Sequence, residues 1–76
     1  MRKPLDPLGE TEMEVLQIVW KLEEASVSDV REQILKYRDV AYTTIMTVMK
    51  NLADKNYLKY RKEGLSYIYS AALQPD

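Results

Sequence analysis

The middle of the chain carries a cluster of threonine side chains on one face of a predicted helix. Within Val40–Asp54, apolar side chains recur at the i, i+3, i+4 and i+7 spacing of a buried helical stripe: Ile45, Val48, Met49 and Leu52. The opposite face carries Thr43, Thr47, Lys50 and Asp54, with Thr44 and Asn51 on one flank and Met46 on the other. A threonine hydroxyl can bond a phosphate or a base edge, and its methyl group can contact the thymine methyl. This face therefore has the chemistry of a helix that lies in a DNA groove.

The residue types that most catalytic and metal chemistry needs are missing. The 76 residues include no His and no Cys, so zinc sites, thiol chemistry and imidazole general bases are excluded. Glu23 and Glu24 form the one acidic pair of note, and nothing beside them completes a catalytic constellation. We therefore expect no enzyme activity, no cofactor and no metal site.

Length and composition indicate one small globular domain that spans residues 1–76. The chain is 46% hydrophobic and 30% charged, a balance typical of a folded domain rather than a disordered segment. No apolar run approaches the ~20 residues of a membrane span, and the N-terminus lacks the pattern of a signal peptide. Because the absence of Cys suits a reducing compartment, we expect a cytoplasmic protein.

The net charge of −1 hides an uneven distribution along the chain. Residues 1–28 hold three cations against six anions, whereas residues 29–62 hold eight cations against four anions. The remaining segment, 63–76, contains two anions and no cation. A chain polarised in this way can attract phosphates with one face while staying near neutral overall.

The first predicted helix spans residues 9–24. Its start has two capping frames, a capping box from Thr11 to Glu14 or one from Gly9 to Glu12. A wide apolar face follows, made of Met13, Leu16 and Trp20 in one row and Val15, Val19 and Leu22 in the next. At this spacing Trp20 is expected to be a core residue rather than an exposed stacking residue.

Two further helices are predicted, over residues 28–38 and 41–55. Ser28 is the expected N-cap of the second helix, and its inward side carries Val30, Ile34 and Tyr37. The third helix is the threonine-bearing one. Asn56 follows it, and Asn readily adopts the left-handed conformation found after helix ends.

A basic β-hairpin is predicted over residues 57–70. The two alternating runs are Tyr57–Lys62 and Ser66–Ser70, and Glu63, Gly64 and Leu65 form the turn between them. Residues 1–8 are expected to be a flexible arm and residues 72–76 a flexible tail. The fold class is therefore mainly α with a small β-hairpin (α+β): a winged helix-turn-helix of three helices and a two- to three-stranded antiparallel wing.

Three segments resemble the penicillinase repressor (BlaI/MecI) family of bacterial winged-helix regulators. These are Leu8–Leu16 with Val19 and Trp20, then Ala41–Thr47 with Leu52 and Lys55, and finally Gly64–Tyr69. The resemblance implies a transcriptional repressor that binds a dyad operator in double-stranded DNA as a homodimer. In that family the dimer forms through a C-terminal helical region, which we expect beyond Asp76.

The resemblance also implies the roles of individual residues. The third helix enters the major groove, and its base-facing candidates are Thr43, Thr44, Met46 and Thr47. Phosphate contacts are expected from Lys50 and from the wing residues Lys59, Arg61 and Lys62. Ser28 has two open interpretations, a phosphate contact through backbone N–H groups or a helix cap alone. Members often carry Arg where this chain has Leu65, and Arg or Lys at the positions of Thr43 and Met46.

A winged-helix protein-interaction module without DNA contact is the alternative function. In that interpretation the basic hairpin binds an acidic protein partner and the threonine face packs on protein. Met46 and the hairpin tyrosines favour it, because Met and Tyr are enriched at protein interfaces. The sequence shows no evidence of a membrane or small-molecule partner.

Overall fold

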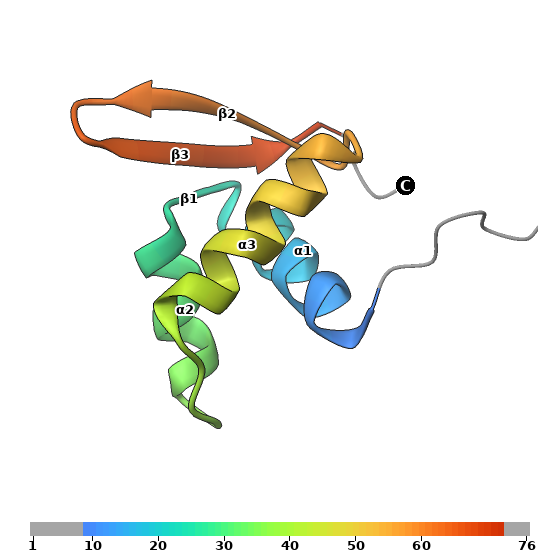
Figure 1. Cartoon of the computed structure of the whole chain (residues 1–76), viewed down its shortest axis with the longest axis vertical. Helices are drawn as coiled ribbons and strands as arrows, with labels where there is room; N and C mark the ends of the chain where they lie inside the picture. Colours follow the sequence, from blue (N-terminus) through green and yellow to red (C-terminus); the bar gives the residue numbers. More distant parts are fainter. Residues whose placement is uncertain (1–8, 73–76) are drawn as a thin grey trace, which may run out of the picture.

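The computed structural model describes residues 9–72, which form three helices and one small sheet (Figure 1). The helices are α1 (Glu10–Leu22), α2 (Val27–Leu35) and α3 (Tyr42–Asp54), and the strands are β1 (Glu24–Ala25), β2 (Leu58–Glu63) and β3 (Ser66–Ala71). The predicted arm, residues 1–8, and residues 73–76 of the predicted tail lie outside the described residues. None of the helices described within residues 9–72 has the length and apolar content to cross a membrane.

The core is apolar and receives one face from each helix. The buried helical side chains are Val15, Leu16 and Val19 from α1, Val27, Val30 and Ile34 from α2, and Ile45, Met49 and Leu52 from α3. Ala25, Leu58 and Tyr69 of the sheet close the same cluster. Among residues 9–72 no polar or charged residue is buried. The helices are therefore held by apolar packing, which leaves the outer face of α3 free for other contacts.

The N-terminus of α1 uses the second of the two predicted capping frames. Gly9 is the N-cap, and its N–H donates to Glu12 Oε1 at 3.1 Å. Because glycine has no side chain to return the bond, only this half of a capping box is made. Trp20 packs against the core while staying partly exposed. The helix ends at Leu22, where Glu23 turns the chain with a φ of 74°.

The prediction that Ser28 caps α2 was wrong, because Ser26 is the N-cap. The Asp29 N–H donates to Ser26 Oγ at 3.1 Å, and the Ser26 N–H donates to Asp29 Oδ2 at 3.1 Å. This reciprocal pair is a capping box in which Asp takes the place of the usual Glu. Val27 is helical and buried, so it belongs to the core. Ser28 lies exposed in the first turn.

The C-terminal end of α2 also differs from the prediction. The helix ends at Leu35, so the helical spacing that would place Tyr37 inward no longer applies there. Tyr37 is 61% exposed, and its hydroxyl donates to Glu14 Oε2. Arg38 also pairs with the Glu14 carboxylate. This polar contact joins the end of α2 to α1 outside the core.

The sheet has three antiparallel strands in the order β1-β3-β2. Glu63 pairs with Ser66, which leaves Gly64 and Leu65 as a two-residue hairpin loop. Gly64 has a φ of 61°, the positive value that such a tight turn requires at its first central position. Asn56 has a φ of 68° and turns the chain from α3 into β2, as predicted. The hairpin extends past the helices, whereas β1 supports only its base (Figure 1).

Candidate nucleic-acid interface

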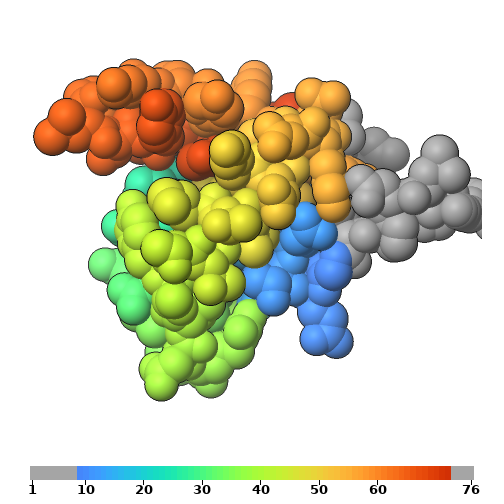
Figure 2. All heavy atoms as spheres, viewed as in Figure 1, coloured from blue at the N-terminus to red at the C-terminus, as the bar shows by residue number. Residues whose placement is uncertain are grey.

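The outer face of α3 presents the predicted base-facing side chains to solvent. Thr43, Thr44, Met46, Thr47 and Lys50 are all exposed, and Figure 2 shows α3 on an open face of the molecule with the hairpin beside it. The three threonine hydroxyls make no hydrogen bond to another residue in the described range 9–72. Packing in the core therefore orients this face of α3, while the threonine hydroxyls stay available for hydrogen bonds.

An apolar groove separates α3 from the hairpin. It has a volume of 270 Å³ and is lined by Met46, Lys50, Ala53 and Asp54 of α3 and by Tyr60, Tyr67 and Tyr69 of the hairpin. The Tyr60 ring meets the Tyr67 ring edge-on at 5.4 Å between centroids and lies 5.5 Å from the Tyr69 ring. Tyr60 and Tyr67 were not among the residues predicted to face DNA. The alternation of aromatic residues in two paired strands is the signal that would have placed them there.

Burial raises the pKa of Tyr69 above its ordinary value, and the neighbouring Tyr60 and Tyr67 reinforce the shift. Its phenol therefore stays neutral at physiological pH. The groove presents an aromatic wall toward α3. Such a wall suits contacts with sugars and base methyl groups rather than with phosphates.

Ser28 lies on the same side of the molecule as α3 and the wing tip. A second groove of 270 Å³ is lined by Ser26–Ser28, Tyr42, Met46 and the wing residues Leu65, Ser66, Tyr67 and Tyr69. Leu65 is fully exposed at the tip. The N-terminus of α2, the first turns of α3 and the wing tip therefore converge around Met46.

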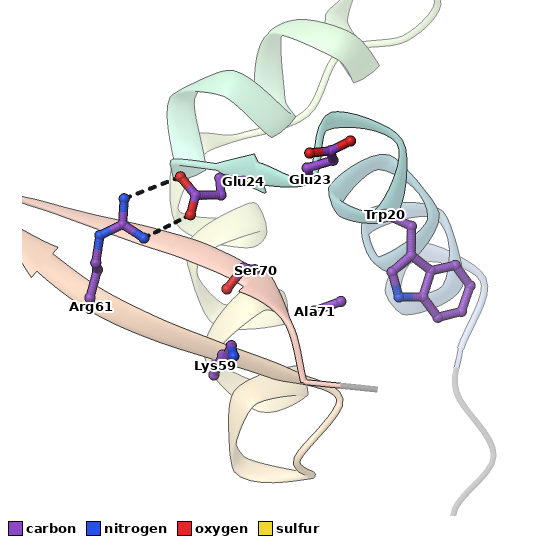
Figure 3. Close-up of a pocket in the computed structure, with 7 residues that line it drawn as sticks. All are labelled: Trp20, Glu23, Glu24, Lys59, Arg61, Ser70 and Ala71. Carbon is purple, nitrogen blue, oxygen red and sulfur yellow. Dashed lines mark hydrogen bonds and ion pairs between the residues drawn. The ribbon is translucent and has the colours of Figure 1, made fainter. Parts of the chain in front are cut away.

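The three predicted cations of the wing do not share one face. Lys62 pairs with Tyr67 and Tyr60 pairs with Tyr69 across the hairpin, so Lys62 lies on the face of the tyrosines that line the α3 groove. Lys59 and Arg61 alternate with these residues and lie on the reverse face. Figure 3 shows them in a separate pocket with Trp20, Glu23, Glu24, Ser70 and Ala71. Only Lys62 is therefore a wing cation on the side of α3.

Arg61 is held by two carboxylates in that reverse pocket. Its Nη1 donates to Glu24 Oε2 at 2.9 Å and its Nη2 to Glu24 Oε1 at 3.1 Å, while its Nε donates to Glu63 Oε2 at 2.7 Å. The hydrogen bonds and charge of Arg61 lower the pKa of Glu24 below its ordinary value. Lys59 makes no ion pair with any described residue. Within residues 9–72, the guanidinium of Arg61 thus has partners, unlike the ammonium of Lys59.

Two other ion pairs fix the helices around α3. Lys55 Nζ at the end of α3 lies 3.2 Å from Glu12 Oε2 at the start of α1. On the other side, Glu14 accepts hydrogen bonds from Tyr37 and Arg38. Burial alone would raise the pKa of the Glu14 carboxyl, but these two bonds and the Arg38 charge lower it. Both pairs lie away from the outer face of α3, so their role is structural.

Comparisons with known proteins agree with this geometry. The sequence model of the penicillinase repressor family matches residues 8–76. The transcriptional regulator BlaI of Mycobacterium tuberculosis is 36% identical over 67 residues, which cover 87% of this chain and 49% of that protein. The chain therefore spans about half the length of the curated relatives it matches.

Solved structures that share the fold include two of BlaI. The solution structure of the DNA-binding domain of the repressor BlaI superposes with a TM-score of 0.80 at 25% identity, covering 96% of this chain and 89% of that one. The monomeric form of Bacillus licheniformis BlaI in complex with the blaP half-operator gives a TM-score of 0.74 at the same identity and coverage. The arrangement of three helices and a three-stranded antiparallel sheet is that of the BlaI winged helix. The chain belongs to the penicillinase repressor family.

Proposed function

We propose that this domain is the sequence-specific DNA-binding part of a transcriptional repressor. The observation that carries the proposal is the convergence of the threonine-bearing face of α3, the N-terminus of α2 and the wing tip on one side of the fold. A structure of the same fold and family was determined with its half-operator. In this proposal α3 lies in the major groove, and the wing follows the adjacent backbone.

The side chains divide into base contacts and phosphate contacts. Thr43, Thr44, Met46 and Thr47 meet base edges through methyl and hydroxyl groups, because α3 presents no cation at these positions. The phosphate ligands are Lys50 of α3 and Lys62 on the same side of the wing, with Lys59 at the margin of the interface.

Ser28 contributes a phosphate contact through its backbone N–H. As a residue in the first turn of α2, it has no intrahelical acceptor for that group. The carboxylate of Asp29 lies in the same turn and is engaged by the Ser26 N–H, which limits its repulsion of a phosphate. We assign Ser28 a positioning contact rather than a part in base recognition.

Two copies act together on a dyad operator in this proposal. A homodimer would double the number of phosphate contacts and link two half-site interactions, which raises the overall affinity by about 10²- to 10⁴-fold when the spacing allows both to form. We place the dimer contacts outside residues 9–72, because the matched residues cover only about half of the longer relatives. In the cell, the protein would then act as a cytoplasmic regulator without enzymatic activity.

A titration against DNA tests the proposal. We expect the domain to bind a random duplex at low salt in fluorescence anisotropy, and in vitro selection to recover a preferred half-site. Three lysine contacts predict a slope of log K against log salt of about −2.7 for one domain. Failure to bind any duplex at tens of micromolar in 50 mM salt would overturn the proposal and favour the protein-interaction module.

Matched substitutions separate the two kinds of contact. Replacing Lys50 by Met should lower the salt slope by about one unit and weaken binding to all sequences alike. Thr47→Val keeps the methyl group and removes the hydroxyl, so it should change discrimination between bases by roughly 1–3 kcal/mol and leave the slope intact. Lys21→Met, on the exposed surface of α1, is the control for a simple loss of charge.

A further inference from the structure

The wing is a long hairpin with a short support. β1 pairs with β3 only at Glu24–Ser70 and Ala25–Tyr69, whereas the β2–β3 ladder continues to Glu63–Ser66 at the tip. Beyond Tyr69 the outer edge of β3 therefore has no neighbouring strand within the described residues. Figure 1 shows the hairpin running well past β1. Backbone pairing alone does not determine the angle at which the free part of the hairpin lies over α3.

Arg61 lies where the hairpin leaves this support. It pairs with Ile68, the first β3 residue beyond the segment that β1 covers. Because the strand order is β1-β3-β2, its side chain must cross the middle strand to reach Glu24 on β1. Figure 3 shows the two guanidinium nitrogens directed at the two carboxylate oxygens across the sheet. The bidentate pair thus links the two outer strands over one face of β3.

The charge of Arg61 is more than compensated locally. One guanidinium faces two carboxylates, those of Glu24 and Glu63, at distances between 2.7 and 3.1 Å. A phosphate approaching Arg61 would meet the two carboxylates that already bind it and would have to displace a bidentate one. Lys62, by contrast, makes no ion pair with a described residue. Arg61 is therefore poorly suited to be a phosphate ligand.

The opposite face of the hairpin carries the contacts toward α3. Tyr60, Tyr67 and Tyr69 lie there and line the groove with Met46 and Lys50. A hairpin supported on both faces has a defined angle over α3, whereas one supported on the tyrosine face alone is free to swing outward. An exposed ion pair adds little to stability, but a bidentate arginine–carboxylate pair fixes geometry.

We propose that Arg61 is a positioning residue which clamps the wing to β1 through Glu24 and thereby holds the wing over α3, without binding DNA phosphate itself. The effect of this clamp on DNA binding rests on the proposed function, whereas the clamp itself is independent of it. This replaces the phosphate role that the sequence pattern indicated for Arg61. Lys50 and Lys62 keep that role, with Lys59 at the margin of the interface.

The two roles predict opposite effects of Glu24→Gln. If Arg61 were a phosphate ligand, loss of the competing carboxylate would free it for the phosphate and strengthen binding. If Arg61 is a clamp, the wing becomes mobile and must be ordered on binding. Affinity for duplex DNA should then fall by about 2- to 12-fold with an unchanged slope. Glu23→Gln is the matched control, because Glu23 is the adjacent exposed acid and makes no ion pair with Arg61.

Arg61→Lys provides a second test of the clamp. Lysine keeps the charge but cannot form the bidentate pair. A clamp predicts that Arg61→Lys weakens binding as Glu24→Gln does, whereas a phosphate ligand would be largely preserved by lysine. Binding by Arg61→Lys equal to the unchanged protein, or stronger binding by Glu24→Gln than by Glu23→Gln, would overturn the proposal.

A measurement without DNA tests the clamp alone. The heteronuclear ¹H–¹⁵N NOE of wing residues 62–67 should fall in Glu24→Gln and Arg61→Lys and stay unchanged in Glu23→Gln. Unchanged values in all three variants would refute the clamp, with a thermal unfolding curve verifying that each variant is folded. If the unchanged protein binds no duplex, the proposed function fails, and the NOE still decides whether Arg61 positions the wing.

Discussion

Met46 and Met49 allow the same substitution to be made at an exposed and at a buried position of α3. They lie three residues apart on the helix, yet Met49 is 0% exposed within the core and Met46 is 44% exposed beside the wing. Replacing each by Ala removes the same atoms and introduces the same residue. Any difference between the two variants must therefore come from the surroundings of each side chain. We expect Met49→Ala to affect folding and Met46→Ala to affect DNA binding.

The magnitudes follow from burial. Removing a fully buried Met side chain costs about 2–5 kcal/mol, from lost transfer energy and the cavity left behind. A chain of 76 residues has a total stability of about 4–11 kcal/mol at the usual value per residue. Met49→Ala should therefore lower the melting temperature by about 8 °C or more. Met46→Ala should change stability by less than about 0.5 kcal/mol, because the site is exposed and Ala favours helix.

The effect on DNA is expected in the reverse order. Loss of an apolar base contact at Met46 corresponds to about 1–3 kcal/mol, or roughly 5- to 150-fold in affinity for a selected site. Met49→Ala, measured at a temperature where it is folded, should bind within about threefold of the unchanged domain. Circular dichroism melts and anisotropy titrations give the two quantities. Equal destabilisation by both variants would refute the assigned burial of the two side chains, and unchanged binding by Met46→Ala would remove Met46 from the interface.

Further outcomes follow from local geometry. Ser26→Ala should destabilise the domain by about 1 kcal/mol through loss of the cap on α2, whereas Ser28→Ala should stay within about 0.5 kcal/mol in urea unfolding. Gly64→Ala should cost about 1 kcal/mol or more because of its φ of 61°, although no atom lies within 4 Å of the added Cβ. Because the folded pKa of Glu14 is lowered, its contribution is present above its ordinary value of 4.5 and is lost as the pH falls through the folded pKa. The difference in unfolding free energy between the unchanged protein and Glu14→Gln should therefore shrink in acid.

The helices were predictable because each buries a stripe at helical spacing. Ile45, Met49 and Leu52 are all buried, as their spacing indicated. The start of α2 was mispredicted because Ser26 and Ser28 are both good caps in sequence. Asp29 decides between them, since the reciprocal bonds of a capping box need the acid three residues after the cap.

The orientation of the wing and the partner of Arg61 could not be predicted from the sequence. Alternation along β2 separates Lys59 and Arg61 from Tyr60 and Lys62, but it does not say which face looks toward α3. The partner of Arg61 is Glu24, 37 residues away and on the far strand of the sheet. Only the three-dimensional arrangement brings the two together, so the sequence alone could not show that Arg61 has carboxylate partners within the protein.

The small number of unpaired lysines determines how the proposed interface should respond to salt. With Lys50, Lys59 and Lys62 as phosphate ligands, affinity of one domain should fall by only about 40-fold between 50 and 200 mM salt. Two linked domains should double the slope and lose about 2,000-fold over the same range. If Arg61 were a fourth ligand, the single-domain loss would approach 150-fold. The salt dependence of one isolated domain therefore distinguishes a three-lysine interface from one that includes Arg61, before any residue is changed. Phosphate contacts carry no sequence information directly, so in either case discrimination between sequences would rest on the threonine and methionine contacts of α3.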